Sequence, residues 1–454
     1  MKTLIKKIEY NLIFIYGLLG TMPIISIFGL TIFSWLTVAV VFFFIIFRVK
    51  GNRENPKFIN PYLIVVCLSV MSALLCLNSS MPSIWKNKQF NGLVWNILYL
   101  IVFIYFSKNR NDIARTFIRG VYISSIVHMV WGYLQFILYT AGGIKLNDVI
   151  FVNLLHMSSD SVTQIKDGSI ALSGLCWNAG NMAPLLILGF AMSTTIPLKA
   201  TFALCTFLSG SRTAVLGLVT YIIISYVLKS GKSKVSKRAW MAALGIAIVG
   251  VPILLGTGRM TTITNAIQKT LSYFSRDTLT RQASAITHLR YLTSVFDVAR
   301  FAGPEKILFG FGIGCSGYPF TVLYQQYNTV DFGAWVVECD IINQLWSTGL
   351  IALIVRYVWY IKYARKAIKI DKKMFCFFIA FFVEGLMYNV TFNWSFIMLV
   401  CMFILMHNKQ PISVVQHTGN KKVVFQVLRQ GYSRYDFKLN EKRYTIRWRQ
   451  RKNG

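Results

Sequence analysis

Long uninterrupted apolar stretches are the feature that most restricts how this 454-residue chain can fold. The first, residues 10–47, is long enough for two helices of about 20 residues, the length that crosses the hydrocarbon core of a bilayer. Only 14% of the residues are charged, whereas soluble proteins have about 25%. A backbone in lipid must satisfy its hydrogen bonds internally, so these stretches predict transmembrane helices and an all-α integral membrane protein.

The apolar stretches amount to about twelve membrane spans. Two lie within residues 10–47, and the first has a basic start without a small-residue cleavage site, so we expect it to be retained. The other spans are expected near 60–79, 91–107, 116–141, 171–195, 198–210, 213–228, 239–256, 341–361, 374–390 and 393–408.

The net charge of +32 is distributed in a way that predicts orientation. With both termini in the cytoplasm, 36 of the 48 Lys and Arg residues fall on the cytoplasmic side, and the ratio is still 24 to 12 without the C-terminal tail. Lys and Arg stay on that side because their translocation is costly and the inner leaflet is anionic. The basic charge is therefore an orientation signal, and nucleic acid is not an expected partner. The cytoplasmic segments are 1–9, 48–58, 108–119, 198–200, 229–238, 356–373 and 409–454.

Spans and loops divide the chain into four parts. The outer loop includes RDTLTRQASAITHLRYLTSVFDVARF, which has helical spacing, and an ordered loop of this length is usually functional. The tail is expected to lie on the anionic inner surface. Eight cysteines occur singly, which indicates small buried side chains and no metal site. The parts are helices over 1–256, a large, partly helical periplasmic loop over 257–337, further helices over 338–408, and a basic cytoplasmic tail over 409–454.

One arginine stands between two apolar stretches, in the sequence SGSRTAVLG. Only 12 residues separate Lys199 from Arg212, so a helix between them rises about 18 Å, less than the roughly 30 Å hydrocarbon core. Two short helices would place Arg212 at the floor of a water-filled recess, where the N–H groups of the turn face an anion. Two alternatives remain open. Arg212 snorkels to the outer interface, or residues 198–228 form one long helix.

Four stretches resemble, in order, the motifs of one protein family. SGSRTAVLG is similar to a Ser-Arg signature, and LSGLCWNAGNMAPLLIL (172–188) to the start of a span with spaced asparagines. HLRYLTSVFDVARFAGPEKILFGFGIG (288–314) is similar to a segment of a large periplasmic loop, and CDIINQLWSTGLIALIV (339–355) to the start of the next span. The family with this order of motifs is the O-antigen ligase and polymerase superfamily.

The resemblance implies a GT-C-like glycosyltransferase that takes its glycan from undecaprenyl pyrophosphate without a metal or other cofactor. In that family an arginine of the Ser-Arg signature and an arginine of the large loop are thought to bind the pyrophosphate, which implies Arg212 and Arg290 here. The chemistry agrees, because guanidinium groups bind the developing charge of a departing diphosphate bidentately. A solvated loop arginine is the alternative for Arg290. Further candidates for the same site are Ser211, Arg281, His288 and Arg300.

Two carboxylates stand at the end of the large loop, in VVECDIIN. Ligases of this family place a histidine two residues before the position of Asp340, and this chain has Glu338 there. A carboxylate can accept the proton that an acceptor hydroxyl loses, so Glu338 is the candidate base and Asp340 its alternative. The alternative is that Glu338 and Asp340 only form a polar rim of the loop. The missing histidine favours a polymerase over a ligase, although the polymerase pattern of arginine, ten residues and glycine is not met at Arg300.

Three further features are less specific. Glu384 lies in an apolar span. We favour a structural residue that is bonded to a neighbouring span, and the alternative is a proton or ion site. Trp177 and Asn178 stand at the outer start of a span, where we expect them either to contact sugar or to pack against the protein. FGFGIG (309–314) is rich in glycine but does not follow a strand of a βαβ unit, so it does not indicate a dinucleotide site.

The sequence therefore predicts a glycosyltransferase of the bacterial inner membrane, with cytoplasmic termini and an active site facing the periplasm. It would polymerise undecaprenyl-pyrophosphate-linked oligosaccharide repeat units into O-antigen or a related surface polysaccharide. The lipid-linked oligosaccharide would be both donor and acceptor, and the other expected partners are membrane lipids and a chain-length regulator. One alternative is a ligase that transfers the glycan to lipid A core. The other is a flippase or transporter, but the long outer loop and the lack of two similar halves argue against it.

Overall fold

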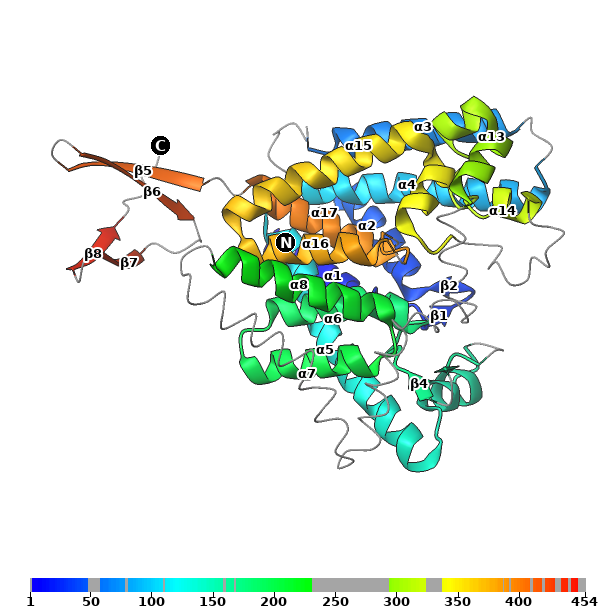
Figure 1. Cartoon of the computed structure of the whole chain (residues 1–454), viewed down its shortest axis with the longest axis horizontal. Helices are drawn as coiled ribbons and strands as arrows, with labels where there is room; N and C mark the ends of the chain where they lie inside the picture. The colour runs from blue at the N-terminus through cyan, green and yellow to red at the C-terminus, as the bar shows by residue number, and fades with distance from the viewer. Residues whose placement is uncertain are drawn as a thin grey trace.

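A computed structural model describes the apolar part of the chain as a bundle of helices (Figure 1). Three of them, α4 (Ser83–Lys108), α5 (Asn111–Gly142) and α15 (Asp340–Ile370), are long and apolar enough to cross a membrane, and several shorter apolar helices accompany them. This composition supports the expected helical membrane protein. The structure describes residues 2–47, 58–77, 81–108, 111–157, 161–166, 169–230, 294–323, 337–386, 388–391, 393–408, 411–418, 421–428, 434–439 and 442–447.

The described helices follow the order of the expected spans. α1 (Lys2–Leu19) and α2 (Ile32–Phe47) share the first apolar stretch and are joined by the hairpin β1 (Ser26–Ile27) and β2 (Leu30–Thr31). The expected span over 239–256 lies outside the described residues, so the total number of spans stays a prediction. The remaining elements of the bundle and its loops are α3 (Asn60–Leu77), the π-helix η1 (Asp148–Leu154), β3 (Gln164–Lys166), β4 (Ser169–Ala171), α6 (Ala179–Met192), α7 (Ile196–Leu208), α8 (Arg212–Ser230), α13 (Val295–Phe309), α14 (Tyr318–Leu323), α16 (Lys372–Glu384) and α17 (Asn393–Asn408).

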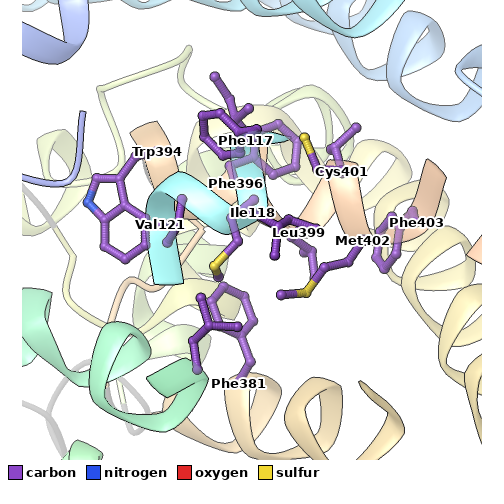
Figure 2. Packing of buried hydrophobic residues seen from close by; sticks show 14 of the residues in the cluster. Phe117, Ile118, Val121, Phe381, Trp394, Phe396, Leu399, Cys401, Met402 and Phe403 are labelled. Carbon is purple, nitrogen blue, oxygen red and sulfur yellow. The ribbon is translucent and has the colours of Figure 1, made fainter. Parts of the chain in front are cut away.

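α17 lies at the centre of the bundle, and its sequence explains its position. Every side chain from Phe396 to Met406 is buried, as expected of a helix that is apolar on all sides. Figure 2 shows aromatic and sulfur-containing side chains of α17 packed among Phe117 of α5 and Phe381 of α16. The core therefore joins helices from the two halves of the chain.

α15 bends sharply at Gly349, whose φ of 82° and ψ of 170° lie outside the helical region. The hydroxyl of Tyr357, beyond the bend, donates to Oδ2 of Asp340, before the bend, over 3.4 Å. In a straight helix these two residues would lie about 25 Å apart along the axis. The short first segment of α15, residues 340–348, therefore folds back toward the longer second segment.

The glycine-rich stretch FGFGIG docks on this bend by its backbone. Phe311 N donates to the carbonyl oxygen of Trp346 over 2.7 Å. A Cβ atom added to Gly349 would lie 2.1 Å from the carbonyl oxygen of Leu308, and one added to Gly310 would lie 2.7 Å from the backbone of α15. The glycines thus permit a close contact between two backbones, and the end of the large loop packs against the bundle.

The tail contains strands, which the sequence analysis did not predict. β5 (Pro411–Thr418) pairs antiparallel with β6 (Lys421–Leu428), and β7 (Arg434–Leu439) pairs with β8 (Lys442–Arg447). β-branched and aromatic residues, as in KKVVFQVL, favour strands, and short connections favour hairpins. The expected place of the tail on the inner surface stays a prediction.

Candidate functional site

Arg212 is the first residue of α8, directly after the turn that ends α7. Two serines stabilise this turn. The Oγ of Ser209 accepts a hydrogen bond from Ser211 N over 3.2 Å, and the Oγ of Ser211 accepts one from Ala214 N over 3.3 Å. Gly210, at a φ of +66°, takes the left-handed conformation that this reversal needs. The prediction of two short helices is confirmed, and the alternative of one continuous helix is wrong.

Arg212 and Ser211 differ in how much they are exposed. Arg212 is half-buried, whereas Ser211 is buried and its hydroxyl also pairs with the hydroxyl of Thr213 over 2.8 Å. Ser211 therefore caps the start of α8, as small hydroxyl residues commonly do. Its predicted contact with pyrophosphate stays a prediction, as does the water-filled recess below Arg212.

α8 packs between α6 and α16, and Gly217 is where it touches both. A Cβ atom added to Gly217 would lie 2.3 Å from Ile187 of α6 and 2.7 Å from Oε1 of Glu384, the last residue of α16. Arg212 precedes Gly217 by about 7.5 Å along the helix axis. Arg212 is therefore at the end of the bundle where α16 ends, as the arrangement in Figure 1 shows.

The start of α6 lies at the same end, because Tyr388 connects it to the segment after α16. Tyr388 N donates to the carbonyl oxygen of Glu384 over 2.9 Å, and a Cβ atom on Gly180 of α6 would lie 2.8 Å from the Tyr388 ring. Asn178 caps α6 by accepting a hydrogen bond from Asn181 N over 2.8 Å. Its Nδ2 donates to the Tyr388 hydroxyl over 2.9 Å, and this hydroxyl also contacts Oδ1 of Asn181. A polar cluster, here called the amide–phenol cluster (Asn178, Asn181 and Tyr388), thus joins α6 to the segment after α16.

Side chains of α5 hold the loop that leads to Trp177. Gly174 N donates to Oε1 of Gln135 over 2.9 Å, and Leu175 N donates to Nδ1 of His128 over 3.1 Å. All four of these residues are buried, whereas Trp177 is 37% exposed. The loop is therefore fixed from inside the bundle, and the indole of Trp177 remains accessible beside the amide–phenol cluster.

The two candidate carboxylates have different surroundings. Asp340 is buried and accepts hydrogen bonds from Thr391 N over 3.2 Å and from the Thr391 hydroxyl, while its own N donates to Gly385 O over 2.9 Å. Glu338 is half-buried and interacts electrostatically with Tyr388. Asp340 therefore anchors backbone, and Glu338 is better placed to meet a substrate. The role of Glu338 as the base, with Asp340 as its alternative, stays a prediction.

Arg356 is a buried cation that the sequence analysis counted on the cytoplasmic face. The structure places it in the middle of α15 with 5% of its surface exposed, and its guanidinium carbon lies 5.2 Å from the centre of the Phe396 ring. It also interacts electrostatically with Asp340. The apolar run around it hid this position, because an arginine near the end of a span is usually solvated. One basic residue therefore has to be removed from the orientation count.

The other predicted cations are not brought to Arg212 within the described part of the chain. Arg300 is exposed on α13, which packs against α15, α3 and α14, whereas α8 packs against α16, α6 and α7. α13 confirms a helix at the end of the stretch that has helical spacing in the large loop. Arg281, His288 and Arg290 lie outside the described residues, so their predicted contact with pyrophosphate stays a prediction.

Glu384 is completely buried beside Gly217, and neither of its carboxyl oxygens has a hydrogen-bond partner among the described residues. The favoured reading, a structural carboxyl bonded to a neighbouring span, is therefore not supported within that part of the chain. Glu384 contributes packing between α8 and α16.

The residues that lie toward one end of the bundle are a half-buried arginine, a half-buried carboxylate, two carboxamides, a phenol and an exposed indole. Groups of these kinds are chemically able to bind an anion, to accept a proton and to form hydrogen bonds with hydroxyl groups. The resemblance to O-antigen ligases and polymerases rests on the four stretches of sequence described above. No protein-family model matches the chain, and no curated protein is significantly similar to it.

Proposed function

We propose that this protein is a membrane glycosyltransferase that polymerises polyprenyl-pyrophosphate-linked oligosaccharides on the outer side of the cytoplasmic membrane. One observation carries the proposal: Arg212, Glu338 and the amide–phenol cluster gather at the same end of the helical bundle. They come from segments far apart in the sequence.

The chemistry follows from these groups. Arg212 binds the diphosphate of the donor, together with the arginines expected from the large loop, and stabilises the charge that develops as the anomeric C–O bond breaks. The oxygen of the acceptor hydroxyl forms the new bond to the anomeric carbon, and Glu338 takes the proton from that hydroxyl. The polyprenyl diphosphate leaves with the bonding electrons. Direct displacement of this kind inverts the configuration at the anomeric carbon.

A polymerase is preferred to a ligase because Glu338 stands where ligases of the resembled family have a histidine. The two activities differ in their acceptor. A polymerase adds the glycan to the sugar of another lipid-linked unit, whereas a ligase adds it to lipid A core.

A deletion strain tests both the class of enzyme and the acceptor. Loss of a polymerase leaves surface molecules with a single repeat unit, whereas loss of a ligase leaves bare core and polymer on the carrier lipid. Complementation with the wild-type chain has to restore the ladder of surface polysaccharide, and complementation with Arg212→Ala must not. An unchanged ladder in the deletion strain would contradict the proposal.

A further inference from the structure

The amide–phenol cluster is a closed ring of hydrogen bonds. Asn181 N donates to Oδ1 of Asn178, Nδ2 of Asn178 donates to the hydroxyl of Tyr388, and this hydroxyl contacts Oδ1 of Asn181. A phenol has a single hydrogen and keeps it at neutral pH. Asn178 already donates to the oxygen of Tyr388 through its Nδ2, whereas the Asn181 atom that contacts this oxygen is Oδ1, which can only accept, so the hydrogen is donated to Asn181. The direction of every bond in the ring is thereby fixed.

The fixed direction determines what Asn181 presents. Its Oδ1 receives the hydrogen of Tyr388, so its Nδ2 carries two N–H donors. Within the described part of the chain these two donors have no hydrogen-bond acceptor, although Asn181 is only half-buried and water or a ligand can reach it. The ring therefore holds a pair of oriented donors on a half-buried side chain.

The neighbours of Asn181 suit a sugar. The exposed indole of Trp177 directly precedes the cap of α6, and Glu338 lies close enough to Tyr388 to interact with it electrostatically. Sugar oxygens accept hydrogen bonds from amide N–H groups, and the C–H face of a sugar ring packs on an aromatic face. A diphosphate, by contrast, is better bound by arginine. The cluster thus fits the acceptor half of the reaction better than the donor half.

We propose that Asn181 binds the acceptor sugar through the two N–H groups of its Nδ2, beside Glu338, and that Asn178 and Tyr388 hold the Asn181 side chain in this orientation. The proposal rests on the proposed glycosyltransferase function and assigns the acceptor subsite within it. Asn181 is then an acceptor-binding residue, and Tyr388 is a positioning residue.

The substitution Asn181→Asp separates ligand binding from the ring. Aspartate keeps the oxygen that accepts the Tyr388 hydrogen, and it replaces only the two N–H donors. The full chain in lipid nanodiscs is tested with two probes: undecaprenyl diphosphate alone, for binding, and polyprenyl-diphosphate glycans extracted from the deletion strain, for transfer. We expect transfer to fall about 10- to 100-fold with a raised KM, because a sugar oxygen would then face an unpaired acceptor. Binding of undecaprenyl diphosphate is expected to stay within about twofold, since that lipid carries no sugar.

Two further variants test the positioning role. Tyr388→Phe removes the hydroxyl that orients Asn181 and should lower transfer, again without loss of diphosphate binding. The matched control is Tyr133→Phe, because Tyr133 donates to the carbonyl oxygen of Thr201 over 2.7 Å between α5 and α7, away from the cluster. Asn178→Asp keeps a good helix cap but loses the donor to Tyr388, so it should resemble Tyr388→Phe.

The outcomes separate the two proposals. Transfer by Asn181→Asp at the wild-type rate overturns the acceptor subsite and leaves the glycosyltransferase standing. Loss of diphosphate binding together with transfer, or equal losses in Tyr388→Phe and Tyr133→Phe, assigns the cluster a structural role and also overturns it. If Asn181→Asp does not fold, the comparison of Tyr388→Phe with Tyr133→Phe decides. A wild-type protein that neither binds undecaprenyl diphosphate nor transfers glycan overturns the proposed function itself.

Discussion

Two of the arginines that lie in apolar helices, Arg212 and Arg356, have opposite surroundings. Arg212 starts α8, is half-buried, and stands at the end of the bundle where Tyr388 and the candidate carboxylate gather. Arg356 lies in the middle of α15 with 5% of its surface exposed, over the ring of Phe396 and near Asp340. One cation is half-buried, and the other is enclosed by the protein.

The difference shows that an arginine within an apolar stretch has two distinct uses. A buried guanidinium such as Arg356 packs on an aromatic ring of another helix and interacts electrostatically with a buried carboxylate, so its loss destabilises the bundle. A half-buried guanidinium at a helix start can form bidentate hydrogen bonds to phosphate. Stability measurements and transfer measurements should therefore separate the two residues.

The largest effect is expected for Arg356→Met. Its guanidinium packs on the ring of Phe396 and interacts electrostatically with the buried Asp340, so its loss should lower the midpoint of unfolding in detergent sharply. Adding Asp340→Asn to the same chain should recover part of the loss, because the uncompensated carboxylate is removed. Independent, additive losses of stability in the double variant would show that Arg356 and Asp340 do not interact. The contrast between Arg212 and Arg356 would then no longer rest on this interaction.

Arg212→Ala should lower glycan transfer about 10²- to 10³-fold, which is the usual cost of removing one group that stabilises developing charge. The unfolding midpoint should hardly change. Arg212→Lys should restore only part of the activity, because lysine keeps the charge but not the bidentate geometry. A loss of stability in Arg212→Ala as large as that in Arg356→Met would erase the contrast between the two arginines.

The two carboxylates sharpen the same contrast. Glu338→Gln should lower transfer about 10²-fold because a proton acceptor is lost, with stability unchanged. Asp340→Asn should cost about 1.5–3 kcal/mol of stability because its hydrogen bonds lose their charge. Parallel measurement of initial rate and unfolding midpoint checks both. An inactive but stable Asp340→Asn protein beside an active Glu338→Gln protein would exchange the proposed roles.

The smallest effect is expected at Asp148, an acid outside the spans that is neither buried with Arg356 nor part of the candidate site. Partial burial would raise the pKa of Asp148, but hydrogen bonds from Ser161, Thr163 and Val162 outweigh it, so the pKa lies below its ordinary value of 3.8. Since the folded pKa is the lower one, the stabilisation is present above pH 3.8 and is lost as the pH falls through the folded pKa.

Asp148→Asn should therefore lose about 1 kcal/mol at neutral pH, after allowance for solvent screening, and nothing in strong acid. Unfolding midpoints of the variant and the wild type across the acid range measure this difference. A difference that grows as the pH falls would contradict the assignment.

Sequence reasoning located the turn before Arg212 because the signal is local. Two serines and a glycine interrupt an apolar run, and the distance between charges shows that the flanking helices are short. The burial of Arg356 was missed because an apolar run gives the position of a helix along the chain and not which side faces a neighbour. The amide–phenol cluster was only partly identified, since Tyr388 and Asn181 lie 207 residues apart. The bend of α15 was also missed, because a single glycine in a span has many possible roles.

The bend at Gly349 and the glycine-rich stretch have a consequence for protein engineering. Their contact is made by backbone against backbone, and neither partner tolerates a side chain there. A chimera that exchanges the segment before α15 with that of another protein would therefore need its junction after Gly349 rather than at the start of α15. Donor and recipient pieces cut between these two surfaces would meet with mismatched shapes, whatever their individual sequences.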